Sequence, residues 1–243
     1  MRTLEIRTDV AADGSRAWRR TLLAMVAVCV PLLAGAGALE ALSSKDASKG
    51  LRAALGQSID AAVTRLGTKD GFLGNPAVRI PLPPALAKLD RGLRLVGMGG
   101  DADALEEAMN RAAESAVAEA KPVLKQALQR MTVEDAKGIL TGGDDAATQY
   151  FRRTTSGTLT AKFKPIVARA TAQVRLASLY DRYAGQAAQF GLVKGADANL
   201  DDYVTARALD GLFKVMADEE RAIRKDPLGQ ASSLIRKVFG SLQ

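Results

Sequence analysis

The chain has 243 residues, with 34 Lys or Arg, 27 Asp or Glu and no histidine, and its formal net charge is +7. Its single cysteine, Cys29, lies in an apolar run near the amino terminus. These absences remove the commonest general base, the usual zinc, copper and haem ligands, and the Ser-His and Cys-His couples of nucleophilic catalysis. We therefore expect no metal site and no cofactor.

The amino terminus predicts export from the cytoplasm. Arg19 and Arg20 precede the apolar run "TLLAMVAVCVPLLAGAGA", which ends in small residues at Ala36 and Ala38. This arrangement is typical of a secretory signal peptide, so we predict that residues 1–38 form a cleavable export signal. The paired arginines also fit a twin-arginine signal, and the Sec and twin-arginine types both stay open. We expect a periplasmic or otherwise exported protein, with an uncleaved amino-terminal anchor as the alternative.

The charge pattern limits the partners. Removing residues 1–38, which hold five Arg and three Asp or Glu, leaves a net charge of +5. Positive and negative residues alternate along the remaining chain, and aromatic residues are scarce, which argues against a nucleic-acid partner. Weak contact with an anionic membrane surface stays possible.

Residues 39–243 are predicted to form a single helical domain. Its first helix precedes Gly67, because apolar residues such as Leu51, Leu55 and Ile59 recur at a helical spacing. The segment "GTKDGFLGNP" then ends this helix with glycines and an Asn-Pro step.

The next segment, "NPAVRIPLPP" at 75–84, is unusual for a helical protein, and we call it the strap. Its four prolines favour an extended backbone. In that conformation Val78, Ile80 and Leu82 point to one side and pack on helices, while Arg79 points to the other. For Arg79 we expect a salt bridge to a helical carboxylate, with solvent exposure or a ligand contact as alternatives.

Two helices follow the strap. Pro84 is well placed as the first residue of one helix, which the glycines within 97–100 are predicted to end. A longer helix opens after Asp101, and Pro122 inside it predicts a kink or a break near Ala120.

Two helix starts in the second half carry capping signals. Thr132 is predicted to cap a short helix with Asp135 reaching back, and Asp144 is predicted to cap the next helix. Pro165 is expected to restart or kink the long helix after that.

A Gly-rich bend at 191–195 should lead into a helix from about Asp201 to Asp226. The segment "LGQASSLIRKVFG" then predicts a last short helix. The fold class is therefore all-α, an irregular bundle of seven or eight helices with one extended proline-rich strap.

Two acidic segments resemble ligand loops but lack the residues those loops need. "DANLDD" has acids at alternate positions, but a calcium loop also requires a later glycine and glutamate that are missing here, so we interpret it as a helix cap. "TGGDDAAT" lacks the lysine of a phosphate-binding loop.

The polar residues that fall on or near apolar helix stripes are the candidate binding residues. Glu220 lies on the stripe of its helix and must be paired or have a raised pKa; Arg224, four residues on, is the expected ion-pair partner. Asn110 and Glu114 share one face of another helix. The complete set of binding candidates is Arg79, Asn110, Glu114, Tyr150, Glu219, Glu220 and Arg224.

Several blocks together resemble one known family. They include "DGFLGNPAVRIPLPPAL", "MTVEDAKGILTGGDDAATQYF" and "LDDYVTARALDGLFKVMADEERAIRKDP". In this order they resemble the exported bacterial family catalogued as domain of unknown function forty-one ninety-seven. The resemblance implies a helical, envelope-located protein and supplies no catalytic residue.

Two functions remain open. The first is a non-enzymatic helical module that binds an envelope protein or an amphiphilic small molecule. The alternative is a carboxylate-dependent hydrolase of an envelope polymer or ester, in which Glu114, Glu219 or Glu220 would line a concave site near Arg79. Structural ion pairs would account for the same residues without any site.

Overall fold

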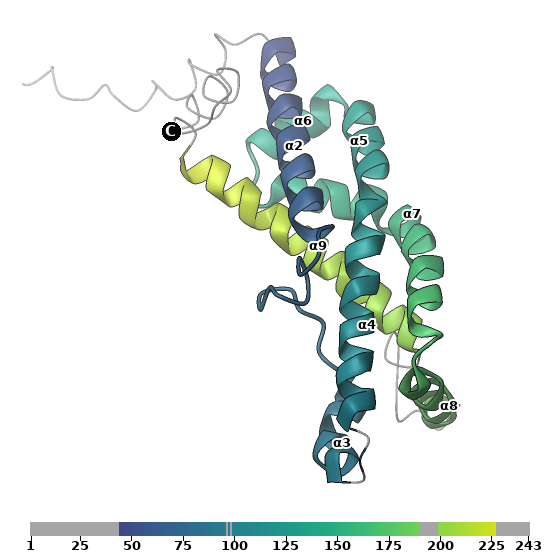
Figure 1. Ribbon diagram of the computed structural model, residues 1–243. Coiled ribbons are helices and arrows are strands. Elements are labelled where there is room, and N and C mark those ends of the chain that lie inside the picture. The colour runs from purple at the N-terminus through teal and green to yellow at the C-terminus, as the bar shows by residue number, and fades with distance from the viewer. Residues whose placement is uncertain (1–43, 96, 98, 190–198, 227–243) are drawn as a thin grey trace, which may run out of the picture.

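The computed structural model describes residues 44–95, 97, 99–189 and 199–226. Within them the protein is all-α and has no strand, as predicted (Figure 1). The predicted export signal, the Gly-rich bend at 191–195 and the last short helix lie outside the described residues. No helix of the described part is both long enough and apolar enough to cross a membrane.

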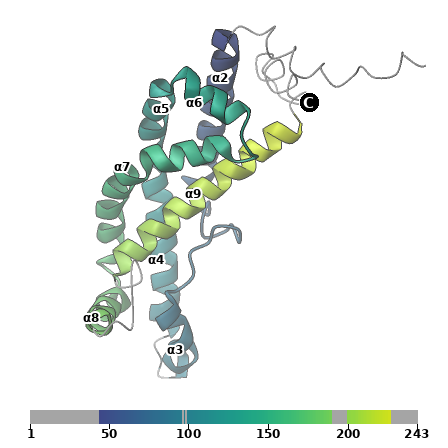
Figure 2. The ribbon, with the colours of Figure 1, turned by 180° about the vertical axis from the view of Figure 1, so that it is seen from behind.

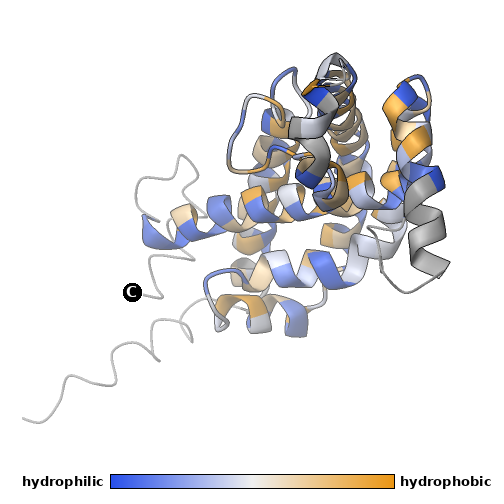
Figure 3. Cartoon of the chain, turned by 90° about the horizontal axis from the view of Figure 1, so that it is seen from below, coloured by the Kyte–Doolittle hydropathy of each residue, from blue (hydrophilic) through white to orange (hydrophobic). Residues whose placement is uncertain are grey.

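The helices follow one another closely along the chain. They are α2 (Ser44–Leu66), α3 (Pro84–Leu95), α4 (Gly99–Ala118), α5 (Ala120–Arg130), α6 (Val133–Leu140), α7 (Ala146–Thr171), α8 (Arg175–Gln189) and α9 (Leu200–Lys225). Hydrophilic and hydrophobic residues alternate along the ribbons (Figure 3), as expected of helices with one buried face.

The centre of the bundle is formed by α4, α7 and α9, which pack against one another. Figure 2 shows α9 crossing the bundle diagonally, with α4 behind it and α2, α5 and α6 toward one end. The largest fully buried side chains come from several elements and include Phe72, Phe151, Phe163, Tyr203 and Phe213.

Most predicted helix boundaries are confirmed. Pro84 begins α3, and the predicted break near Ala120 lies at Glu119, between α4 and α5. The start of α4 differs slightly, since this helix begins at Gly99 and not after Asp101. Thr132 caps α6 with Asp135 reaching back to its N–H, as predicted.

Pro165 does not restart the helix, because α7 continues through it to Thr171. A proline leaves the carbonyl four residues earlier without its helical donor, here that of Ala161. Ala161 and Pro165 are both exposed, so water can bind this carbonyl. Phe163 and Val167 beside the proline are fully buried, and their packing offsets the roughly 3 kcal/mol cost of a helical proline.

The strap begins with a turn and becomes extended only afterwards. The N–H groups of Val78 and Arg79 both donate to the Asn75 carbonyl (3.1 and 2.8 Å), and the Asn75 side chain accepts from the Ala77 N–H (3.2 Å). The asparagine thus stabilises a turn that the proline count alone does not predict. Val78 and Ile80 are buried and Arg79 is exposed, as expected.

The strap region approaches α9 most closely at Gly211. A Cβ atom there would lie 2.6 Å from Cε1 of Phe72 and 3.3 Å from Cβ of Val78. Both neighbours are buried, so neither can move away without disturbing the core. Gly211 therefore allows the segment before α3 to lie directly on α9.

We expect Gly211→Ala to lower the free energy of unfolding by about 1–3 kcal/mol, because the clash with Phe72 outweighs the higher helix propensity of alanine. Gly157→Ala in α7 is the matched control. Its Cβ would meet nothing within 4 Å, so it should raise the free energy of unfolding by about 1 kcal/mol. Urea unfolding followed by circular dichroism measures both, and stabilisation by Gly211→Ala would contradict the close approach.

Candidate functional site

Asn110 of α4 hydrogen-bonds the backbone of the strap. Its side-chain oxygen accepts from the Ile80 N–H (2.9 Å), and its amide nitrogen donates to the Ile80 carbonyl (2.9 Å) and to the Glu106 carbonyl (2.8 Å). Asn110 is fully buried. One side chain thus satisfies both polar backbone groups of Ile80, as a neighbouring strand would.

Glu114, one turn further along α4, binds the segment before the strap. Its carboxylate accepts from the N–H groups of Phe72 (3.1 Å) and Leu73 (3.2 Å) and pairs with Arg111 (2.9 Å). Arg111 also pairs with Asp70 (2.9 Å), which has a positive φ of 66°. The shared face of Asn110 and Glu114 therefore holds the non-helical segment between α2 and α3.

Arg79 forms the predicted salt bridge to a helical carboxylate. Its Nε lies 2.8 Å from Glu106 of α4, one turn before Asn110. On the other side, the buried Tyr203 of α9 donates its hydroxyl to the Pro81 carbonyl (3.1 Å). The strap is thus bound by polar side chains of α4 and α9.

Glu220 binds the amino terminus of α7. Its carboxylate accepts from the N–H groups of Ala147 and Thr148 and from the Thr148 hydroxyl, each at 2.9 Å. Asp145, the residue before α7, makes no side-chain capping bond. The prediction that Asp144 caps this helix is therefore wrong, because a carboxylate of α9 already occupies the free N–H groups.

The predicted ion pair between Glu220 and Arg224 is confirmed at 2.9 Å. Arg224 also donates to the carbonyl of Ile139, near the end of α6 (2.7 Å). The pair is almost fully buried, with 4% of the Glu220 and 13% of the Arg224 side chain exposed. It joins the end of α6, the start of α7 and the last turns of α9.

The two remaining candidates lie elsewhere. Glu219 is partly exposed and pairs with Arg65 of α2 at 3.6 Å. Tyr150 is buried, and its hydroxyl donates to the carbonyl of Ala127 in α5 (3.0 Å). Burial, with a smaller contribution from the Asp135 carboxylate, raises the pKa of Tyr150 above its ordinary value.

Two shallow grooves flank α9. The first, which we call the strap groove, has a volume of about 360 Å³. It is lined by Ala77, Val78, Arg79, Ile80, Pro81, Arg207, Asp210, Gly211 and Lys214. Arg79 is the only predicted candidate in this lining.

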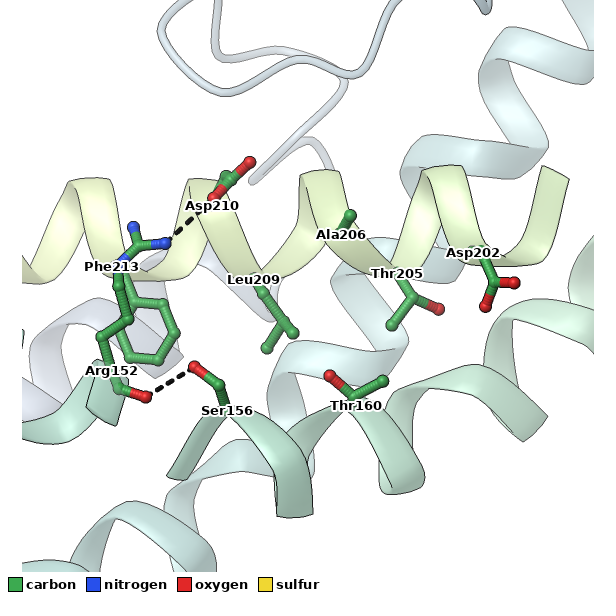
Figure 4. Close-up of a pocket in the computed structure, with 9 residues that line it drawn as sticks. All are labelled: Arg152, Ser156, Thr160, Asp202, Thr205, Ala206, Leu209, Asp210 and Phe213. Atoms are coloured by element: carbon green, nitrogen blue, oxygen red, sulfur yellow. Dashed lines mark hydrogen bonds and ion pairs between the residues drawn. The ribbon is translucent and has the colours of Figure 1, made fainter. Parts of the chain in front are cut away.

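The second groove lies between α7 and α9, and we call it the hydroxyl groove (Figure 4). Its volume is about 410 Å³, and it is lined by Arg152, Ser156, Thr160, Asp202, Thr205, Ala206, Leu209, Asp210 and Phe213. Sequence reasoning missed it. The available signal was the four-residue spacing of Arg152, Ser156 and Thr160, which places them on one face of α7.

Neither groove is lined by Glu114, Glu219 or Glu220. The first and last of these bind backbone N–H groups and arginines, and Glu219 pairs with α2. The geometry therefore gives no support to an active site built from these carboxylates and Arg79. What the grooves provide is cations, hydroxyls and apolar side chains for binding.

Substitution of Glu220 by glutamine should lower the free energy of unfolding by about 2–4 kcal/mol. The amide would turn an N–H group toward the donors of α7 and remove the negative charge that pairs with Arg224. Urea unfolding measures the loss, and amide exchange at Ala147 and Thr148 should accelerate. Glu219→Gln is the adjacent control and should cost less than about 1 kcal/mol. Equal effects at the two positions would contradict the capping role.

Tyr150 should make stability depend on alkaline pH. Because its folded-state pKa lies above its ordinary value of 10.0, its contribution is fully present below that pH and is lost as pH rises through the folded value. We expect Tyr150→Phe to be less stable at about pH 8, through loss of the bond to Ala127, but to lose less stability between about pH 9 and 11. Urea unfolding across this range tests the prediction, and identical pH profiles would refute it.

Comparison with known proteins places the chain in a family. The model of a family described as "Protein of unknown function (DUF4197)" matches residues 41–240, which include every described helix. No curated protein and no solved structure matches the chain. Because the match covers most of the 243 residues and confirms the resemblance seen in the sequence blocks, the chain belongs to the DUF4197 family of proteins of unknown function.

Proposed function

We propose that the protein is an exported, non-enzymatic binding module of the cell envelope that holds an anionic amphiphile in the strap groove. The observation that carries this proposal is the convergence of three cationic side chains on an apolar surface. Arg79 comes from the strap, and Arg207 and Lys214 come from one side of α9. Asp210 is the only acidic residue of this lining.

The cations keep donors for an anionic group beside their present contacts, and Lys214, which pairs with Asp218 (3.1 Å), has further N–H groups on its ammonium. Arg207 is exposed and its guanidinium lies 5.2 Å from the ring centroid of Tyr203. It forms no ion pair with a carboxylate of the described residues. Arg79 uses its Nε for Glu106 and keeps further N–H donors. Because Arg79 and Lys214 are each paired with a carboxylate, the charge of Arg207, unpaired within the described residues, is what favours an anionic head group.

The apolar part of the groove suits the stem of an amphiphile. The lining includes the apolar strap residues Val78, Ile80 and Pro81, which lie next to Gly211 of α9. The volume of about 360 Å³ lies at the lower end of the range for small-molecule sites. The backbone beneath is held by Asn110, so the site is preformed and little entropy is lost on binding.

The residue types of the chain and the contacts of its buried carboxylates support a non-enzymatic role. The sequence has no histidine, and residues 39–243 have no cysteine. The buried carboxylates of Glu114 and Glu220 are engaged by backbone N–H groups. Export and the envelope location rest on the signal pattern of residues 1–38.

Titration with decanoate, monitored by calorimetry and backbone amide shifts, tests the proposal. Decanoate should bind and shift the amides of the strap and of Gly211, while uncharged decanol should bind more weakly. Arg207→Gln should weaken decanoate binding about fivefold, because one charge-assisted contact is lost.

Lys225→Gln is the matched control for this experiment. It makes the same change in net charge at another exposed residue of α9, outside the groove lining. It should leave the affinity within about twofold of the unmodified protein. If Arg207→Gln and Lys225→Gln behaved alike, or if decanoate did not bind, the strap groove would not be the site proposed here.

A further inference from the structure

Thr205 of α9 carries a buried hydroxyl without a hydrogen-bond partner. The residue is 2% exposed, and its Oγ1 has no partner in the described structure. Most buried polar side-chain atoms in proteins are paired. Thr155 and Thr171 of α7, equally buried, follow this rule and donate to the carbonyls of Phe151 and Val167.

Thr205 lies where a bound ligand could supply the missing hydrogen-bond partner. It lies in the lining of the hydroxyl groove, and Figure 4 shows its side chain pointing from α9 toward α7. Thr160 faces it from α7, and Ser156 lies one turn away on α7, opposite Leu209. Ser156 donates to the Arg152 carbonyl (2.6 Å), so its oxygen can still accept, and the Thr160 hydroxyl is exposed.

The charges at the two ends of the groove are already compensated. Arg152 pairs with Asp210 at 3.1 Å and lies 4.7 Å over the ring of Phe213. At the other end Asp202 pairs with Lys164, whose Nζ lies 2.6 Å away. Because both charges are paired, neither end of the groove carries a net charge that would favour an ion, whereas a neutral ligand can add hydrogen bonds to the unused donors and acceptors of these pairs.

The ligand chemistry follows from these groups. The hydroxyls of Thr160 and Thr205 can donate and accept, that of Ser156 can accept, and the ion pairs at the ends offer fixed donors and acceptors. Between them Ala206 and Leu209 present C–H groups. We infer that the hydroxyl groove is a second ligand site, which takes a neutral, hydroxyl-rich ring such as a sugar unit. This site is separate from the strap groove and does not depend on the proposed function.

Thr205 can reach such a ligand by a small movement. A χ1 rotation of about 120° moves the hydroxyl into the position that the methyl group now holds and moves the methyl group to that of the Cβ hydrogen, and threonine in a helix uses two χ1 rotamers. The hydroxyl then gains the partner it lacks, which makes Thr205 a specificity residue for this groove. The groove should bind a ligand with a hydroxyl at that position more tightly than an analogue with a C–H group there. The analogue would leave the Thr205 hydroxyl without a hydrogen bond.

The test uses methyl glucoside as the probe, with the full chain and with Thr205→Val. Amide shifts of Ser156, Thr160 and Thr205 in the unmodified protein should follow one saturable curve. Thr205→Val removes only the hydroxyl and should weaken binding about tenfold. It should also raise the melting temperature by about 2–4 °C, because an unpartnered buried hydroxyl is replaced by a methyl group.

Two control variants separate the ligand role from stability. Ser58 of α2 also has a buried hydroxyl without a partner but lines neither groove, so Ser58→Ala should raise the melting temperature and leave binding unchanged. Thr155→Val removes a hydroxyl that is bonded to the Phe151 carbonyl (2.6 Å), so it should lower the melting temperature and leave binding unchanged.

Several results would overturn the inference. One is that the unmodified protein and Thr205→Val bind methyl glucoside with equal affinity. Another is that methyl glucoside shifts only amides outside the hydroxyl groove, and a third is that it shows no saturable binding. Stronger binding of glucosamine or glucuronate, the cationic and anionic counterparts, would overturn the neutral character assigned to the ligand. If the protein bound methyl glucoside but not decanoate, the strap-groove proposal would be refuted and the inference about the hydroxyl groove would still hold.

Discussion

The strap needs hydrogen bonds for its backbone inside a bundle of helices, and α4 supplies them with side chains. Asn110 binds both the N–H and the carbonyl of Ile80, so that one side-chain amide replaces a neighbouring strand. Glu114 does the same for the N–H groups of Phe72 and Leu73. An unsatisfied buried polar group costs about 1–3 kcal/mol, so the path of the whole segment between α2 and α3 depends on this face of α4. The strap groove exists because the strap is held there.

Glu220 likewise supplies hydrogen-bond acceptors to free backbone N–H groups, here those at the start of α7. Its carboxylate is therefore not available to bind a ligand. Its carboxylate is engaged by two N–H groups, a hydroxyl and Arg224, and it is buried. A carboxylate in such surroundings is a structural anion, comparable with a helix cap supplied from a distant part of the chain. Glu114 is in the same situation. The polar residues that first suggest chemistry therefore hold the scaffold together, and the two grooves proposed for binding lie beside α9.

Both grooves share α9 as a wall but differ in chemistry. Arg207 and Lys214 give the strap groove its positive charge, whereas Thr205 and Leu209 face α7 in the hydroxyl groove. Asp210 lies at the margin of both, and its pair with Arg152 compensates its charge on the α7 side. One helix thus separates the groove that we propose for an anionic amphiphile from the groove that we propose for a neutral, hydroxyl-rich ligand.

The sequence by itself determined the all-α class, most helix boundaries, the cap of Thr132 with Asp135, and the pair of Glu220 with Arg224. These features depend on contacts within about one helical turn, or on the conformational limits of proline, and both are visible in the local sequence. Only the tertiary structure decided that Glu220 caps a helix 73 residues away, that Asn110 binds the strap, and that Thr205 faces Thr160 of α7. Such contacts depend on how helices cross, and residue spacing along one helix does not specify the partner that another helix brings to it.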